Sequence, residues 1–499
     1  MRTHRSALTA LPLACVLAWL GGCGPGRDYR EPEIAAPARW QGPEAADESS
    51  APLSRWWTSF GDDRLDRLIV LALEENLDLR LAVARLDEAR ARRGVVRWAQ
   101  LPEIDARGSA ERRRYSENVF GPSGEIQNHF DAGFDASWEI DLFRGVRREV
   151  EASDADLQAL DAARLDMRTV VAAETARAYL DLVGNQELLA VLRADLADLR
   201  QARDLVHARV AAGVAPDVDL AQQDALIASA VATLPEPEAR RVNALTRLAV
   251  LTARPASDVL AAIAQADGAD PFAGLPGVTR LPEARALFAA GLPSDLLRRR
   301  QDLRRAERAY AAAVARIGVA ERALYPRFSL TGTFGLESTD SEDLLKVGSL
   351  FWSIGPAVRW PILQQGRIRA QVAAADARAE QAEIAYHQAV LVAFADVEDA
   401  LAALARAQER SRAIDEALAA HERSLALVRA RYERGAIGLI SLLTEQRAVS
   451  GARAQTVEAR TAMALRVVTL AKALGGGWEP APPGPIADTV RPPSPERSP

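Results

Sequence analysis

The first candidate for chemistry in this sequence is a cysteine close to the N-terminus. Arg2 and Arg5 form a basic start, and an apolar run from Leu8 to Leu20 follows. This run is too short to span a bilayer and is typical of a signal-peptide core. It ends in Leu20-Gly21-Gly22-Cys23, which matches the bacterial lipobox, a motif whose cysteine is acylated and becomes the first mature residue. The sequence predicts a covalent lipid such as palmitate on Cys23; the alternative is an ordinary signal peptide with a chance cysteine.

The surroundings of Cys23 also predict a compartment. Gly24 follows the cysteine, whereas an aspartate at that position is the usual signal for retention in the inner membrane. We therefore expect an outer-membrane lipoprotein. Cys15 leaves with the signal peptide and Cys23 carries the lipid, so the mature chain keeps no free cysteine for a disulfide, a thiol nucleophile or a metal site.

No other group of residues has the spacing of a catalytic or metal site. The histidines, at positions 4, 129, 207, 387 and 421, lack ligand spacing, and no Gly-rich phosphate loop or Ser/His/Asp arrangement is recognisable. The acidic run Asp396-Val397-Glu398-Asp399 is more typical of the solvated face of a long helix than of an acidic site. We therefore expect no enzyme, and no metal or cofactor besides the lipid. The net charge of −6, without a basic block, gives no case for nucleic-acid binding.

Two long proline-free segments are the main structural elements that the sequence predicts, and any functional site must be positioned by them. They run from Gly145 to Gly213 and from Gly366 to Gly435, and they are rich in Ala, Leu, Val, Glu, Arg and Gln. This composition is typical of long helices, and glycine is expected just past a helix end. At ~1.5 Å per residue each helix would be roughly 100 Å long, about three times the hydrocarbon core of a bilayer.

Four stretches alternate strictly between apolar and polar residues, which predicts strands. They cover residues 104–111, 130–141, 328–336 and 352–360. Alternation alone would fit a soluble, half-buried sheet, but the lipoprotein signal favours a sheet in the outer membrane. A sheet in lipid must close, and barrels start at ~8 strands, so four strands require other copies of the chain.

The fold class that follows is mainly α with a membrane β-barrel. Three chains would form a trimeric 12-stranded β-barrel, with four strands per chain, continued by a long α-helical barrel. The arginines at 112–114 would then lie at the outer rim, where they could contact lipopolysaccharide; an ordinary charged loop is the favoured alternative.

Each half of the chain repeats one plan of helix, two strands, long helix, tip and return helix, and the two halves are offset by 221 to 224 residues. The first helix of each half is expected over about residues 62–98 and 295–323. The expected organisation is a signal peptide (1–22), a lipidated N-terminal tether and equatorial segment (23–61), a first repeat (62–253), an inter-repeat connector (254–294), a second repeat (295–474) and a disordered Pro-rich tail (475–499).

Several motifs resemble the TolC-like outer-membrane efflux proteins, in particular the lipoprotein branch that serves resistance-nodulation-division pumps. The resemblance covers residues 23 to about 477. The motifs are Ala72-Leu73-Glu74-Glu75-Asn76-Leu77-Asp78-Leu79-Arg80-Leu81-Ala82, Gly291-Leu292-Pro293-Ser294-Asp295-Leu296-Leu297 with Ala306-Glu307, Leu324-Tyr325-Pro326-Arg327-Phe328, and Arg431-Tyr432-Glu433-Arg434-Gly435 with Leu442-Leu443 and Gln446. Gln301 stands where the family usually has proline, and we expect a small local change there.

The resemblance implies a homotrimer in which substrates pass passively from an inner-membrane transporter and a periplasmic adaptor to the exterior. It implies adaptor docking at the helical tips, around Gly213, Pro216, Asp217, Arg434, Gly435 and Gly438. It also implies a periplasmic gate at Ile440, Thr444 and Arg447. Thr444 stands where the family has an acidic residue. We therefore expect the gate to depend on packing of Ile440 and on pairing of Arg447 with an acidic neighbour such as Glu445.

The leading interpretation is an exit duct of a tripartite efflux pump, lipid-anchored in and spanning the outer membrane and extending into the periplasm. The main alternative is a periplasmic coiled-coil scaffold or adaptor lipoprotein without a pore. Two hairpins and four strands favour the duct. The exported compound, whether drug, metal ion or solvent, stays open.

Overall fold

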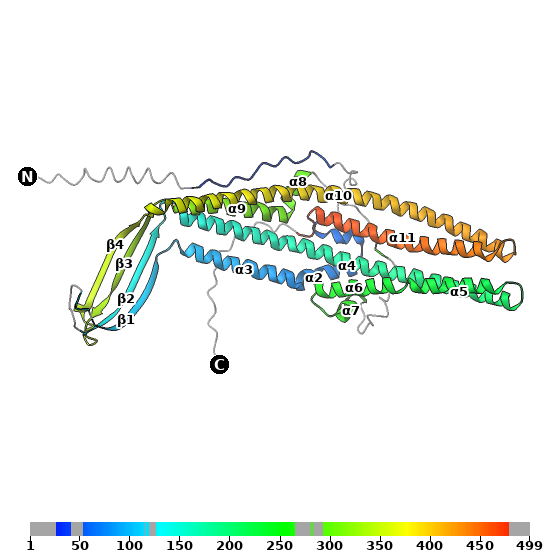
Figure 1. Ribbon diagram of the computed structural model, residues 1–499, viewed down its shortest axis with the longest axis horizontal. Coiled ribbons are helices and arrows are strands. Elements are labelled where there is room, and N and C mark those ends of the chain that lie inside the picture. Colours follow the sequence, from blue (N-terminus) through cyan, green and yellow to red (C-terminus); the bar gives the residue numbers. More distant parts are fainter. Residues whose placement is uncertain are drawn as a thin grey trace, which may run out of the picture. The chain divides into compact units, whose positions relative to one another are not determined.

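The computed structural model describes residues 26–40, 53–114, 116–118, 126–264, 281–282 and 293–478 (Figure 1). The signal peptide, Cys23, most of the connector and residues 479–499 of the tail lie outside these ranges. The chain divides into two compact units, each of which takes residues from both halves of the sequence. Unit 1 comprises Met1–Gly42, Glu75–Met167 and Gly291–Asp399, and unit 2 comprises Pro43–Glu74, Arg168–Ala290 and Ala400–Pro499.

Unit 1 contains one antiparallel sheet with the strand order β1-β2-β3-β4 (Figure 1). Its strands are β1 (Glu103–Arg114), β2 (Ile126–Ile140), β3 (Arg327–Ser338) and β4 (Leu350–Arg359). All four predicted strands are confirmed. β2 begins four residues earlier than expected because residues 126–129, which include two polar side chains at 127 and 128 and a histidine at 129, pair with the arginine-rich end of β1.

The register sorts the side chains of all four strands onto two faces. One row across the sheet joins Ala106, Phe134, Phe334 and Trp352, and the next row joins Asp105, Asp135, Thr333 and Ser353. Because successive side chains of a strand point to opposite faces, the even-numbered residues form an apolar face and the odd-numbered residues a polar one. The apolar face is uncovered in the single chain: Phe134 and Phe334 are each 55% exposed and Trp352 is 69% exposed.

Among the described residues, five helices contribute to unit 1, and four of them have one end next to a strand of the sheet. They are α3 (Leu77–Trp98), α8 (Pro293–Arg299), α9 (Gln301–Arg322), and the sheet-proximal parts of α4 (Gly145–Ala211) and α10 (Gln365–Glu433). Ion pairs join α3 and α9 to α4, from Arg93 to Asp154 and from Arg316 to Asp156. The long helices α4 and α10 confirm the two long helices that the sequence predicts.

Two expected helices are broken near their middle or start. The helix expected over 62–98 is interrupted at Asn76, whose side-chain oxygen accepts hydrogen bonds from the backbone N–H groups of Asp78 (2.9 Å) and Leu79 (3.1 Å). Asparagine in this role caps a new helix. The helix expected over 295–323 is interrupted at Arg300, which is extended, and Gln301 begins α9 with its side chain buried.

The N-terminal tether packs against the helices of unit 1. The Tyr29 hydroxyl donates a hydrogen bond to Glu307, and its ring meets Tyr310 edge-on with centroids 5.6 Å apart. Asp28 forms an ion pair of 2.6 Å with Arg148 in the first turn of α4. This hydrogen-bonded guanidinium holds the pKa of the Asp28 carboxyl below its usual value. These contacts attach the tether to the helices of unit 1 at residues 28 and 29.

Unit 2 contains the remaining helices. They are η1 (Leu53–Phe60), α2 (Asp63–Glu75), α5 (Asp217–Ala232), α6 (Pro235–Leu251), α7 (Ala256–Ala264), α11 (Leu439–Ala473), and the tip-proximal parts of α4 and α10. Trp56 and Tyr179 are completely buried in its core, where the Tyr179 hydroxyl donates a hydrogen bond of 2.6 Å to Asp62. No helix in the described part of the chain is long and apolar enough to cross a membrane.

Candidate functional site

The first tip joins α4 to α5 through a tight, hydrogen-bonded turn. Gly213 has φ of +71°, and its N–H donates to the carbonyl of Val210 (2.9 Å). The N–H of Val214 donates to the carbonyl of Arg209 (2.9 Å). These two bonds are those of a Schellman motif, in which glycine takes the left-handed position just past the helix end. Pro216 then precedes the first residue of α5, Asp217.

The second tip joins α10 to α11 in the same way. Gly435 has φ of +73°, its N–H donates to Tyr432 (2.9 Å), and the N–H of Ala436 donates to Arg431 (3.0 Å). Gly438 precedes the first residue of α11, and Arg434 is exposed between the two helices. The two tips therefore have equal length and the same hydrogen bonds. Five of the six residues expected at the tips lie in these turns, and the sixth, Asp217, begins α5.

A cluster of apolar side chains holds the two hairpins together just behind the tips. Its buried members come from all four helices: Leu199, Val206, Leu226, Tyr432, Leu439, Leu442 and Leu443. At its edge, the guanidinium of Arg209 lies 4.7 Å from the centre of the Tyr432 ring, which is a cation–π contact between the two tips. Gln223 is fully buried beside this cluster and donates to the carbonyl of Leu199 (2.8 Å).

The three expected gate residues share one face of α11. Ile440, Thr444 and Arg447 stand at positions i, i+4 and i+7, which is helical spacing along one side. All three side chains are exposed, Ile440 by 67%. The Thr444 hydroxyl donates to the carbonyl of Ile440 (2.8 Å), so it is satisfied within its own helix. The structure therefore brings the three residues together as an exposed strip next to the second tip.

The expected pairing of Arg447 with Glu445 does not occur within the chain. The Glu445 carboxylate lies 2.9 Å from Nδ1 of His421 on α10. Residues two apart on a helix do not face each other, which is why Glu445 and Arg447 diverge. Arg447 makes no hydrogen bond or ion pair with any residue in the described ranges. It lines a groove of about 600 Å³ together with Leu226 and Pro237.

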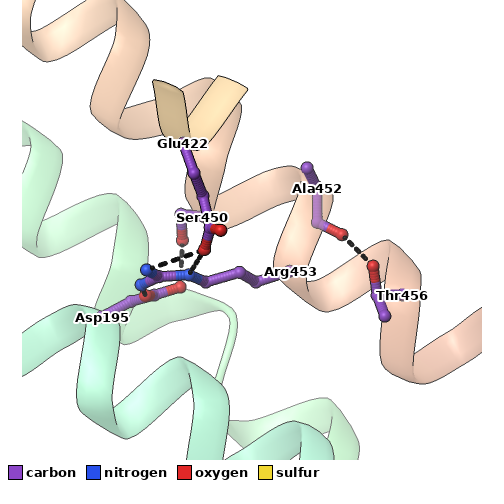
Figure 2. Close-up of polar contacts among 6 residues, drawn as sticks. All are labelled: Asp195, Glu422, Ser450, Ala452, Arg453 and Thr456. Atoms are coloured by element: carbon purple, nitrogen blue, oxygen red, sulfur yellow. Dashed lines mark hydrogen bonds and ion pairs between the residues drawn. The ribbon is translucent and has the colours of Figure 1, made fainter. Parts of the chain in front are cut away.

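A buried carboxylate links α4 to α11 farther from the tips (Figure 2). Asp195 on α4 is buried, and it accepts a hydrogen bond from Ser450 (2.6 Å) and one from Arg453 Nη1 (3.0 Å), both on α11. Arg453 also reaches Glu422 on α10, at 3.3 to 3.4 Å. Burial disfavours the charged guanidinium, but its bonds to Asp195 and Glu422 outweigh that effect and raise the pKa of Arg453.

Sequence reasoning missed this network because its members are far apart in the chain. Asp195 and Arg453 are separated by 258 residues, and nothing in either local sequence marks a partner. Tyr432 stands in a motif, but its place in the apolar cluster behind the tips is visible only in the structure. Among the described residues, no cluster of three His, Cys, Asp or Glu side chains could hold a metal ion.

Comparison with known proteins places these features in a family. Residues 68–254 and 292–476 both match the family described as "Outer membrane efflux protein". The chain is 33% identical over 463 residues to the pyoverdine export outer membrane protein OpmQ of Pseudomonas putida, covering 89% of this chain and 93% of the relative. It is 30% identical over 482 residues to the outer membrane protein OprJ of Pseudomonas aeruginosa, covering 96% and 97%.

Solved structures agree with the sequence relatives. The structure described as the outer-membrane channel OprN is 31% identical, with a TM-score of 0.83, and covers 92% of this chain and 100% of its own. The open state of the MtrE outer membrane channel of Neisseria gonorrhoeae is 29% identical, with a TM-score of 0.80, and covers 92% and 99%. The strand-and-hairpin architecture, the paired tips and these relatives together show that the chain belongs to the outer membrane efflux protein family and is an efflux channel of the outer membrane.

Proposed function

We propose that three copies of this chain form one duct, the exit component of a tripartite efflux pump. The observation that supports this assembly is the sheet of unit 1. It has a continuous, exposed apolar face, and its outer strands β1 and β4 have no strand partner on their outer edges among the described residues. Pairing β4 of one chain with β1 of the next would satisfy both edges and close twelve strands around a lumen.

In this assembly the two faces of the sheet take two environments. The apolar face, with the row Ala106, Phe134, Phe334 and Trp352, meets lipid, and the polar face, with Asp105, Asp135, Thr333 and Ser353, lines the lumen. Alternation of this kind is the signature of outer-membrane barrels. The order α3-β1-β2-α4-α5-α6 followed by α9-β3-β4-α10-α11 supports duplication of one unit within each chain.

The tether and the tips take the remaining roles of the duct. Cys23 would carry the lipid, three residues before the described tether begins at Gly26, and the contacts of Asp28 and Tyr29 would hold that anchor beside unit 1. The paired Schellman turns present two short, matched loops that would dock the helical hairpins of a periplasmic adaptor. An inner-membrane transporter of the resistance-nodulation-division type would supply the energy, and the duct itself would conduct passively.

The gate in this proposal is the strip of Ile440, Thr444 and Arg447. In a three-fold channel each of these residues becomes a ring of three around the axis. Three threonines do not repel one another as carboxylates would, so the closed aperture would depend on Ile440 packing and on Arg447 pairing with an acidic residue of a neighbouring chain. Relatives are named for different compounds, such as pyoverdine for OpmQ and solvents for SrpC, which fits a duct that does not itself choose the compound.

Neighbouring residues on opposite faces of β3 provide the test. Phe334→Arg places a charge on the apolar face, and an arginine at the bilayer midplane costs about 2 to 4 kcal/mol per chain. Thr333→Arg, one residue away, places the same charge on the polar face and is the matched control. We expect Phe334→Arg to lower the yield of trimer in outer-membrane fractions sharply, and Thr333→Arg to leave it near normal.

Conductance of the purified protein in planar bilayers completes this test. The duct predicts discrete ion-conducting events for the parent protein and for Thr333→Arg. A periplasmic scaffold without a pore predicts no conductance and equal tolerance of both substitutions, and that result would reject the proposed function.

A further inference from the structure

Two arginines break the separation of charge between the faces of the sheet. Every other Asp, Glu, Lys and Arg in the four strands stands at an odd-numbered position and therefore on the polar face: residues 103, 105, 107, 111, 113, 131, 135, 139, 327, 337 and 359. Arg112 and Arg114 alone stand at even-numbered positions of β1, on the apolar face. The register thus splits the run of three arginines, with Arg113 on one face and its two neighbours on the other.

Both exceptions lie just past one end of the apolar band. On β2 the band extends from Ile140 to Phe130, which at ~3.4 Å per residue is roughly 34 Å along the strand. Strands tilted by ~35–45° would make this band about 25 Å tall, the height of the apolar belt of outer-membrane barrels. The next two partners along β2, Asn128 and Ile126, pair with Arg112 and Arg114.

The two ends of the band carry different chemistry. At the end where the helices attach, the indole N–H of Trp138 donates to the carbonyl of Gln100 (3.0 Å), and that of Trp360 donates to Leu324 (3.1 Å). Tryptophan at this level is typical of a membrane–water interface. The opposite end, where the strands meet their connecting loops, carries the two arginines. In the proposed duct this loop end faces the exterior, so the arginines lie at the outer leaflet.

The two guanidinium groups are available to a ligand. Arg112 is exposed and makes no hydrogen bond or ion pair with any described residue. Arg114 has one ion pair of 3.5 Å, with Glu117, and both of those side chains are more than two-thirds exposed. Residues two apart on one strand face lie about 7 Å from each other, so both arginines can reach one phosphorylated headgroup. Arginine is well suited to phosphate because its planar fork donates two parallel hydrogen bonds.

We propose that Arg112 and Arg114 bind the phosphate groups of an anionic lipid in the outer leaflet of the outer membrane. The charge of the pair, its place on the lipid-facing side and its level just above the apolar band all match such a headgroup. Arg113 does not take part, because it lies on the lumen face, where it pairs with Glu111 at 3.2 Å. This inference rests on the proposed barrel.

The test uses the mature full-length protein purified in detergent and titrated with lipid A that carries two phosphates. The variant Arg112→Gln/Arg114→Gln is compared with Arg113→Gln, which removes a charge from the adjacent position on the other face. Near a membrane surface each arginine contributes about 1 kcal/mol, so the double variant should bind about 30-fold more weakly. Arg113→Gln should bind within about twofold of the parent. Native mass spectrometry of bound lipid gives the readout.

Each outcome decides one question. Equal loss in Arg113→Gln would show a general effect of positive charge and overturn the inference, as would unchanged binding in the double variant. Displacement of lipid A by an equal concentration of inorganic phosphate would show a site for free phosphate and would also overturn it. Lipid A with one phosphate removed should bind to the parent more weakly than intact lipid A does. The double variant should bind the two lipids equally.

The same samples also test the proposed function, through their trimer mass and their ion conductance. If both variants are trimers that conduct ions but lipid binding is unchanged, the lipid inference fails and the duct stands. If the parent protein does not form a trimer, the proposed duct is rejected.

Discussion

Loss of Arg453 should loosen α11 from α4 far more than loss of its second partner does. Arg453 joins two carboxylates that differ in burial: the Asp195 side chain is 8% exposed and the Glu422 side chain is 47% exposed. Arg453→Gln leaves the Asp195 carboxylate buried with Ser450 as its one remaining donor among the described residues (Figure 2). Hydrogen bonds to charged groups contribute about 1.5 to 3 kcal/mol. Because Arg453 is itself partly exposed, we take about 2 kcal/mol as the cost of losing its bond to Asp195.

Hydrogen–deuterium exchange of the purified protein measures this loosening. A local opening that becomes about 2 kcal/mol easier speeds amide exchange in the affected turns of α11 by about 30-fold. The control Glu422→Gln removes only an exposed ion pair and should speed exchange by less than about twofold. Peptides that cover residues 446–457 report on the relevant turns.

A double substitution tests the physical reason directly. If the cost of Arg453→Gln comes from an unpaired buried charge, then Asp195→Asn in the same chain removes that charge. Exchange in the double variant should be slower than in Arg453→Gln alone. Equal exchange in Glu422→Gln and Arg453→Gln would refute the reasoning, as would exchange in the double variant that is no slower than in Arg453→Gln alone.

Three further predictions concern the tips, the gate and the anchor. Gly435→Val forces a β-branched residue to φ of +73°, a strain of about 1 to 2 kcal/mol, and should reduce export while the yield of trimer stays normal. The control Gly438→Ala, at φ of −80°, should not reduce export. Both are measured as export from cells that carry the complete pump. Arg447→Ala should raise the resting conductance in planar bilayers, and Thr444→Asp should raise cation selectivity by adding a ring of three charges; unchanged recordings would remove residues 440–447 from the constriction. Cys23→Ala should abolish labelling by radioactive palmitate, and labelling that persists would disprove the lipid site.

Periodicity and glycine placement predicted the parts of the fold that depend on local sequence. The alternation around Phe134 and Phe334 located the central strands, and Gly213 and Gly435 located both tips, because a left-handed backbone position strongly favours glycine. The break at Asn76 escaped prediction, because the apolar spacing continues across it while a side-chain cap ends one helix and begins the next. The packing of the tether was not predicted, because its partners, such as Arg148 and Glu307, are distant in sequence.

The candidate site was less accessible from sequence than the fold. Resemblance to a family identified the strip from Ile440 to Arg447, and helical spacing places these residues on one face. The contact of Glu445 with His421 was not predicted, because it depends on how α10 and α11 pack, which no local pattern encodes. The Asp195–Arg453 bond was not predicted for the same reason, because it depends on how α4 and α11 pack. Polar contacts between elements far apart in the chain require coordinates.

The mass of the mature protein in detergent tests the central claim most directly. Four strands with an exposed apolar face and two open edges cannot form a closed barrel alone. We therefore predict that native mass spectrometry finds one dominant species with three times the mass of the mature, lipidated chain. A folded, stable species that contains a single chain would contradict the duct.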